Sequence, residues 1–150
     1  MPKRVRLALA TTLAVATAIV AGCGGEDRLS TEEFQQRANA VCAKYNDKIA
    51  ALGNPSSPEE IPEFVKKGIP LIEQGLAELR SLNPPEEFES DYDRMLDETA
   101  KAIPAARRLA DAAEKHDAAA VQEALQAGQR AGAASDEIAT KLGLDQCAQG

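Results

Sequence analysis

The sequence has 150 residues, with 17 Lys and Arg against 24 Asp and Glu, one His and three Cys. This length favours a single folded domain, and a net charge of −7 excludes the broadly basic surface that nucleic-acid-binding proteins present. One His and three Cys are too few for a Cys/His zinc site once the cysteines have other roles. We therefore expect no metal, no cofactor and no nucleic-acid partner.

Residues 1–22 have the pattern of a signal peptide. Lys3, Arg4 and Arg6 are followed by the uncharged apolar run Leu7–Ala21 and then by small residues. This order is typical of a secretory signal. The run is shorter than the ~20 residues that span the hydrocarbon core of a bilayer. We therefore expect residues 1–22 to direct export and to be removed.

The residues before Cys23 resemble the lipobox of bacterial lipoproteins. Val20 is aliphatic, and Ala21 and Gly22 are small, as that motif requires. The resemblance implies that the Cys23 sulfur receives diacylglycerol and that Cys23 becomes the mature N-terminus, so that the protein is held on the extracytoplasmic face of the membrane. Residues 23–29 would then be the lipidated cysteine and a flexible polar tether. Ordinary secretion and an uncleaved anchor are the alternatives.

The helical domain is predicted to cover residues 30–150. Ser30 and Glu33 have the spacing of a capping box, which marks a helix start. Gly53 is a natural C-terminal stop. Between them, apolar residues recur every three or four positions, as on one face of a helix: Phe34, Ala38, Val41, Tyr45, Ile49 and Leu52.

Prolines mark the next two predicted helices. Pro58 lies at the start of the second helix, whose main part is expected to begin near Ile61. Pro70 lies inside it and predicts a bend or a division into two pieces, because proline removes a backbone hydrogen bond. The third helix follows Pro85, and Pro104 is a second candidate kink.

The fourth helix is predicted to run from an Asp117 N-cap to Gly143, which suits the left-handed position of a Schellman ending. Four helices joined by short turns favour antiparallel neighbours, and strand signals are nearly absent. The predicted fold class is therefore all-α: an up-down-up-down four-helix bundle with Pro-kinked second and third helices, preceded by a signal peptide and a flexible tether.

Cys42 and Cys147 remain once Cys23 is assigned to the lipid. An even pair of cysteines in an exported chain predicts one disulfide, and two buried free thiols are the alternative. Closing a loop of roughly 100 residues contributes about 4–5 kcal/mol in the chain-entropy model. Because Cys42 lies well inside the first helix, the chain after Gly143 must fold back, or the helices must be staggered, for the bridge to form.

Candidate catalytic groups are few. His116 is the sole imidazole, and as a catalytic base it would be helped by Asp117 or Glu114. No second ligand or nucleophile stands at a helical spacing from it, so a turn residue at a helix C-terminus is the preferred interpretation. The acidic run from Glu86 to Asp93 suits the first turn of a helix. We predict no catalytic residue and no metal ligand.

The two internal prolines suggest where a ligand could bind. Bent helices separate and can leave a cleft between them. The residues near the predicted kinks that would line such a cleft are Phe64, Ile69, Tyr92 and Ile103. The alternative is that ordinary packing fills the space.

Residues 1–147 resemble the small helical lipoproteins of actinobacteria. Those proteins pair a lipobox with one Cys in the first helix, in an Ala-hydrophobe-Cys-Ala setting, and one Cys after a terminal Leu-Gly-Leu. The matching segments here are Ala40–Ala43 and Leu142–Cys147. The resemblance implies a location and a fold, and no reaction.

Three functions follow from these patterns. The preferred one is a membrane-anchored, non-enzymatic helical module outside the cytoplasm that contacts a protein partner of the cell envelope. The alternative is a carrier or sensor of a small apolar ligand bound between kinked helices. An enzyme built around His116 is the third.

Overall fold

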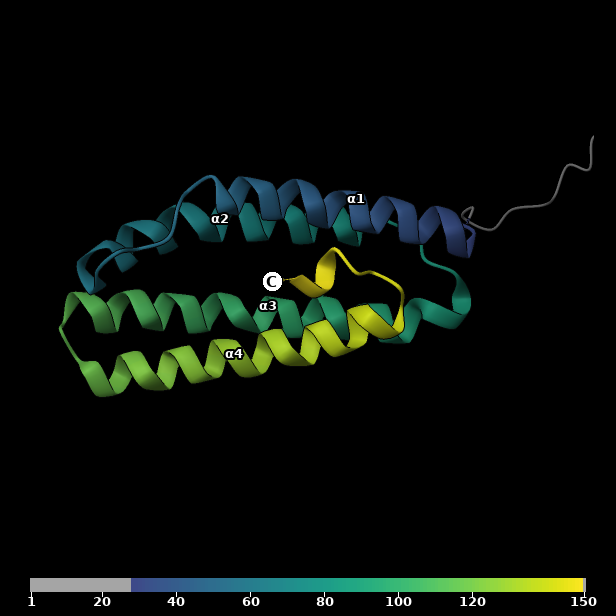
Figure 1. The fold of residues 1–150 in the computed structure, drawn as a ribbon. Coiled ribbons are helices and arrows are strands. Elements are labelled where there is room, and N and C mark those ends of the chain that lie inside the picture. The colour runs from purple at the N-terminus through teal and green to yellow at the C-terminus, as the bar shows by residue number, and fades with distance from the viewer. Residues whose placement is uncertain (1–27, 150) are drawn as a thin grey trace, which may run out of the picture.

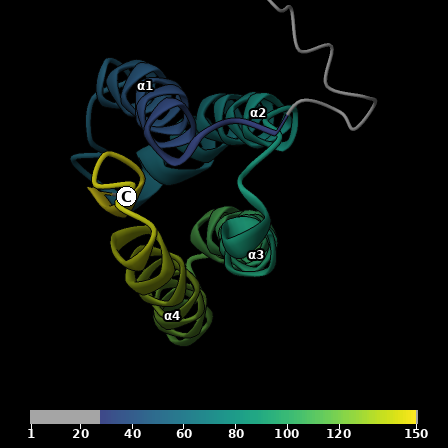
Figure 2. The same cartoon turned by 90° about the vertical axis from the view of Figure 1, so that its right-hand side faces the viewer.

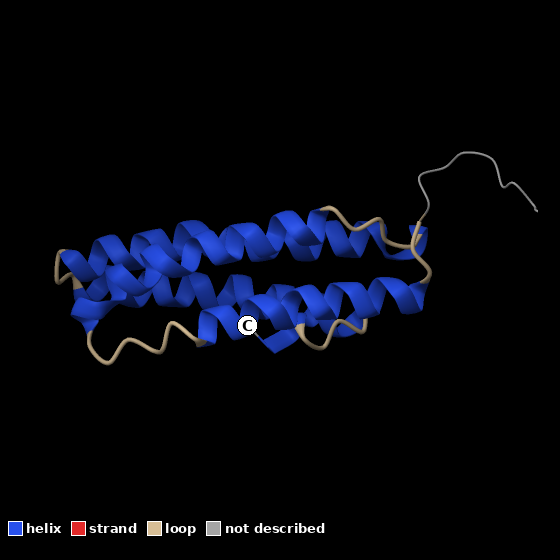
Figure 3. Cartoon of the chain, turned by 90° about the horizontal axis from the view of Figure 1, so that it is seen from above, coloured by secondary structure: helices blue, strands red, loops and turns tan. Residues whose placement is uncertain are grey.

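The computed structural model describes residues 28–149, so the predicted signal peptide (1–22), its lipobox and Cys23 lie outside it. Within this range the chain is helical and has no strand, as predicted (Figure 3). None of the helices in residues 28–149 is both long and apolar enough to cross a membrane. The elements are α1 (Thr31–Ala50), the 3-10 turn η1 (Pro58–Glu60), α2 (Ile61–Arg80), α3 (Glu86–Glu114), α4 (Ala118–Lys141) and the 3-10 turn η2 (Cys147–Gln149).

Successive helices run in opposite directions, which confirms the all-α bundle with up-down-up-down order (Figure 1). Seen from one end, α1 and α2 form one layer, and α3 and α4 form the other (Figure 2). Within the described helices α1 and α4, no pair of Cα atoms lies within 8 Å, whereas η2 contacts both helices. The C-terminal turn therefore stands where a closed bundle would have an α1–α4 contact.

The helix starts are capped as the sequence predicts. Ser30 Oγ accepts a hydrogen bond from Glu33 N (3.3 Å), and the Glu33 side chain accepts one from Ser30 N. Asp117 Oδ1 accepts from the backbone amides of Ala119 and Ala120 at the start of α4. These bonds satisfy amides that a first helical turn leaves without partners. They fix where α1 and α4 begin.

Two helices end in Schellman motifs. After α4, the amide of Leu144 bonds back into the last turn (2.8 Å), and Gly143 has the predicted left-handed conformation, with φ +72°. After α3, Asp117 N donates to Ala112 O (3.0 Å) in the same pattern, and His116 takes the left-handed position with φ +53°. His116 is thus an exposed turn residue, as predicted.

Pro70 and Pro104 lie inside continuous helices. α2 begins at Ile61, as predicted, and is one helix of 20 residues, so the expected division into two pieces is wrong. Pro104 lies inside the 29-residue α3 in the same way. The bend that each proline favours stays a prediction.

The most buried large side chains gather at one end of the bundle. The ring of Phe34 on α1 meets Tyr92 on α3 edge to face, with 4.8 Å between centroids. The Tyr92 hydroxyl donates to Leu79 O on α2 (2.9 Å), and Met95 and Leu142 are fully buried nearby. Elsewhere α3 and α4 pack through small buried side chains: Ala105, Ala112, Ala113, Ala124 and Ala131.

The chain enters the domain against the α2–α3 turn. Leu29 N donates to Asn83 O (3.0 Å), and Arg28 donates to Pro84 O (3.0 Å) and pairs with Glu89 (2.8 Å). Arg28 and Leu29 were predicted as the end of a flexible tether at 23–29. The structure corrects that boundary, because these hydrogen bonds dock both residues on the folded domain.

Candidate functional site

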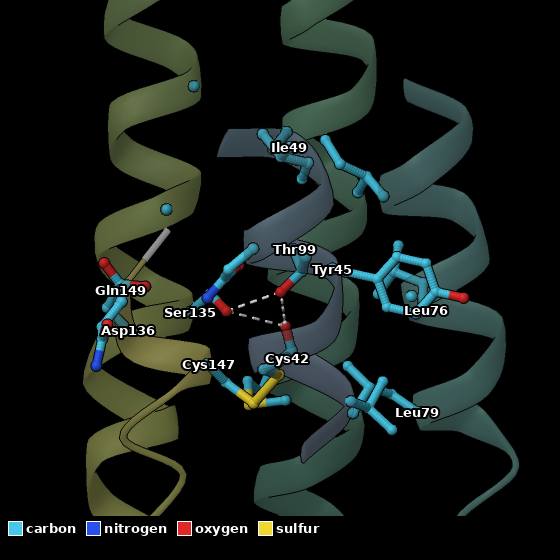
Figure 4. Close-up of a pocket in the computed structure, with 18 of the residues that line it drawn as sticks. Cys42, Tyr45, Ile49, Leu76, Leu79, Thr99, Ser135, Asp136, Cys147 and Gln149 are labelled. Atoms are coloured by element: carbon cyan, nitrogen blue, oxygen red, sulfur yellow. Dashed lines mark hydrogen bonds between the residues drawn. A yellow bond between two sulfur atoms is a disulfide. The ribbon is translucent and has the colours of Figure 1, made fainter. Parts of the chain in front are cut away.

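A cleft of about 850 Å³ opens between the α1–α2 layer and the α3–α4 layer (Figure 4). Its lining is mostly apolar and comes from all four helices and η2. The lining includes Tyr45 and Ile49 of α1, Leu76 of α2, Thr99 of α3 and Gly132 of α4. Protein pockets that bind small ligands have volumes of roughly 300–1,000 Å³, so this cleft is large enough to hold one.

Helical periodicity and glycine account for the cleft. Val41, Tyr45 and Ile49 are four residues apart and therefore share one face of α1. Gly128 and Gly132 have the same spacing on α4. A Cβ added at Gly132 would meet no atom within 4 Å. The cleft thus includes space that Gly132 leaves open, between two helices whose described Cα atoms stay more than 8 Å apart.

Tyr45 forms one wall and places its polar end outside the cleft. Its ring lies 3.2 Å from where a Cβ on Gly75 would be, so any larger residue at position 75 would force this ring to shift. Its hydroxyl donates to Glu78 Oε2 (3.1 Å), which also accepts from Lys44 Nζ (2.8 Å). The Lys44 hydrogen bond lowers the pKa of the Glu78 carboxyl. Lys48 lies over the Tyr45 ring, 4.6 Å from its centroid, and neither lysine lines the cleft.

The predicted disulfide between Cys42 and Cys147 is present, with an S–S distance of 2.03 Å, and both cysteines line the cleft (Figure 4). The C-terminal tail, defined here as residues 142–149, turns at Gly143 and runs back along α1 (Figure 1). Of the two arrangements expected from the sequence, the tail therefore adopts the folded-back one. The bridge ties α1 to the chain that leaves α4.

Amide side chains on α1 hold the tail along its path. They lie four and seven residues apart, on the face that also carries Cys42. The bonds are Gln35 Nε2 to Leu142 O (2.8 Å), Asn39 Nδ2 to Gly143 O (3.1 Å) and Asn46 Nδ2 to Gln146 O (2.8 Å). These contacts were not predicted from the sequence. The signal that could have found them was a row of amides beside the apolar stripe.

Two hydroxyls join α3 to α4 inside the cleft. Thr99 Oγ1 donates to Met95 O (3.0 Å) and lies 2.8 Å from Ser135 Oγ (Figure 4). Ser135 is buried, with 6% of its surface exposed. Because both hydroxyls bond to each other and to the α3 backbone, they fix the spacing of the two helices.

Asp136 on α4 is the one charged residue in the described lining. It lies beside Gln149 at the α4 side of the cleft (Figure 4). Within residues 28–149, no side chain or amide donates a hydrogen bond to its carboxylate, and no Lys or Arg pairs with it. Burial raises the pKa of this carboxyl. The cleft thus carries a single negative charge that has no partner in the described chain.

The four residues predicted to line a cleft do not line this one. Tyr92 is fully buried in the core and reaches Leu79, whereas Phe64 lies about 22 Å along α2 from Leu79. Ile69 is buried, and Ile103 packs partly buried against the core. The prediction placed the opening at the internal prolines, but the observed one arises from glycines on α4 and from the missing α1–α4 contact.

His116 lies far from the cleft. It is exposed at the α3–α4 turn, and the first α4 residue of the lining, Gly128, lies about 15 Å along the helix from Ala118 at 1.5 Å per residue. In the described part of the chain, no three His, Cys, Asp or Glu residues are grouped so that they could hold a metal ion.

No protein-family model matches this chain, and comparisons with curated proteins and with solved structures find no match either. Function is therefore inferred from the cleft itself. Its features are its volume, its apolar walls, its glycine-lined α4 side and its single unpaired carboxylate.

Proposed function

We propose that this protein is a membrane-tethered binding protein whose cleft holds a small molecule with a large apolar part. The observation that carries this proposal is the apolar cleft of about 850 Å³ between the two helix layers. Unfilled apolar space costs stability, because the atoms around it lose packing contacts. A bundle with a purely structural role gains by closing such a space, whereas a carrier or sensor requires it.

The dimensions of the cleft suit a chain-like or small ring-shaped ligand. Its lining on α1 extends from Val41 to Ala50, about 14 Å at 1.5 Å per residue. Polar groups inside it, Thr99 and Ser135, already bond to each other and to backbone. We therefore propose binding without a reaction, and the carrier or sensor is the function that we favour over the contact module.

The location of the protein belongs to the same proposal. The basic start, the apolar run and the small residues before Cys23 support export and lipidation. Two acyl chains on Cys23 would give stable membrane attachment, since one chain alone binds only marginally. Arg28 docks the chain on the α2–α3 turn, so the domain would be held to the membrane from that end.

Filling the cleft from α4 tests the proposal. Gly132→Leu places a side chain where a Cβ meets nothing within 4 Å, and it replaces a weak helix former by a strong one. We expect native mass spectrometry of the exported full chain to detect a discrete extra mass that the variant loses. As a second readout, N-phenyl-1-naphthylamine should bind saturably to the wild type and not to Gly132→Leu. The chain has no Trp, so this probe can be read without background.

Ala77→Leu is the matched control, because Ala77 is exposed on α2 and does not line the cleft. It should keep both the extra mass and the probe binding. Circular dichroism and the mass of the disulfide-bonded chain check that each variant folds. The proposal is wrong if no saturable binding is found, or if Gly132→Leu binds as the wild type does.

A further inference from the structure

We infer that the cleft selects an amphipathic amine, meaning an apolar body that carries a protonated nitrogen, and disfavours anionic molecules such as fatty acids. This inference rests on the proposed function, because it names the class of ligand for the same cleft. Charge complementarity carries it. Asp136 is the one charged side chain in the described lining, and no Lys or Arg lines the cleft.

Three basic residues on α1 and α4 are engaged outside the cleft. Lys44 pairs with Glu78 at 2.8 Å, and Lys48 lies over the Tyr45 ring. At the end of α4, Lys141 Nζ pairs with Asp91 Oδ2 at 2.6 Å. An anionic head group entering the cleft would therefore find no cation in its lining and would meet the carboxylate of Asp136.

A cationic partner would stabilise the ionised carboxylate of Asp136. Its carboxylate accepts no hydrogen bond from residues 28–149, and burial raises the pKa of this group, so its charge is less well solvated than in water. A protonated amine within hydrogen-bond distance supplies both the opposite charge and the missing donor. A second carboxylate would add repulsion to the same site.

Most polar side chains of the lining lie on the α3–α4 side, and the amide of Asn46, the exception on α1, already bonds to Gln146 O. This arrangement orients such a ligand. Ser135, Asp136 and Gln149 lie on the α4 side, while Tyr45 and Leu76 lie across the cleft on the α1–α2 side (Figure 4). An apolar body can lie against α1 and α2 while its nitrogen faces Asp136. The charged and apolar sides of the cleft thus match the charged and apolar parts of an amphipathic amine.

Three probes of equal chain length test this inference: decylammonium, decanol and decanoate, each below its critical micelle concentration. They compete with N-phenyl-1-naphthylamine on the full chain carrying Cys23→Ala, which lacks the lipid acceptor. We expect decylammonium to bind about fivefold or more tightly than decanoate, with decanol between them. Asp136→Asn should reduce this ratio to nearly one, and Asp136→Lys should reverse it. Gly132→Leu gives the background of binding outside the cleft.

The outcomes separate the two proposals. If decanoate binds as tightly as decylammonium, or if Asp136→Asn leaves their ratio unchanged, the charge selection is wrong and the binding function stands. If no probe binds above the Gly132→Leu background, both are wrong. Helicity measured by circular dichroism shows that a change of ratio in the Asp136 variants does not come from unfolding.

Discussion

Position 143 favours glycine for two reasons: its backbone conformation and the close approach of Gln35. Its φ of +72° is strained for any residue with a Cβ, and a Cβ there would lie 2.5 Å from Gln35 Nε2. Gln35 is flexible enough to move away, but it would then lose its hydrogen bond to Leu142 O. The turn into the tail and the attachment of the tail to α1 therefore depend on the same glycine.

We expect Gly143→Ala to lower the free energy of unfolding by about 1–2 kcal/mol, as measured by urea denaturation. Gly68→Ala is the matched control. Gly68 lies inside α2, and a Cβ added there would meet no atom within 4 Å, so alanine should raise stability by roughly 0.5–1 kcal/mol. Equal effects of the two substitutions would show that Gly143 has no special conformation.

The buried phenol of Tyr92 should lower the free energy of unfolding in alkaline solution. Burial is the main reason that the pKa of its phenol is raised in the folded protein. Below about pH 10, the usual pKa of tyrosine, the phenol is neutral in both states and its contribution is fully present. Above that pH the unfolded state loses the proton first, so the free energy of unfolding falls as pH rises.

Tyr92→Phe should remove this part of the alkaline slope in unfolding curves recorded between pH 8 and 11. At pH 7 it should cost about 1 kcal/mol, because Leu79 O loses its donor. Tyr92 is the one residue that differs between the two proteins, so the difference between their slopes isolates its contribution. An unchanged slope in the variant would contradict the assignment.

At the scale of elements, the tail substitutes for an α1–α4 interface. α1 contacts α2, but no described Cα atom of α4 lies within 8 Å of a Cα atom of α1. η2 contacts both α1 and α4. Hydrogen bonds from Gln35, Asn39 and Asn46 and the Cys42–Cys147 bridge attach the tail to α1. The tail keeps the layers together beside the cleft without closing it.

Replacing both bridge cysteines by serine should destabilise the domain by about 4–5 kcal/mol in the chain-entropy model, a large share of the 5–15 kcal/mol typical of a whole domain. Urea denaturation measures this loss, and wild-type protein reduced with dithiothreitol should match the Cys42→Ser, Cys147→Ser variant. Alkylation of exported wild-type protein should find no free thiol at either position. A loss below about 1 kcal/mol would mean that the amide bonds alone hold the tail.

At the scale of the whole molecule, the proposed function combines a tether and a cleft. The lipid on Cys23 would restrict the domain to the membrane surface, where amphipathic molecules are concentrated. The cleft lies between the two helix layers, with Ser135 and Asp136 on its α4 side (Figure 4). A carrier or sensor of amphipathic amines at the membrane would use both parts.

We expect Cys23→Ala to abolish metabolic labelling with a palmitate analogue and to release or mislocalise the protein. Only a thiol at this position can form the thioether, so Cys23→Ser should behave in the same way. Cys42→Ser, which removes a different thiol, should keep the label. Normal labelling of Cys23→Ala in fractionated membranes would overturn the proposed anchor.

Local patterns in the sequence determined much of the fold. Caps such as Ser30 and Asp117 and the Gly143 ending act within one helical turn, so the residues that make them are close in the chain. The cysteine pairing was predicted from the two cysteines that remain if Cys23 carries a lipid outside the cytoplasm. His116 was missed as the Schellman residue of α3 because it is not the glycine that normally marks this position.

The cleft was decided by tertiary structure. Whether α1 and α4 touch depends on how the tail packs between them, and a pattern along one helix carries no information about that distance. Phe64, Ile69, Tyr92 and Ile103 were chosen for their closeness to prolines, yet none of them lines the cleft, which opens beside Gly132. Periodicity shows which face of a helix is apolar, whereas the space between faces is set by side chains from several helices at once.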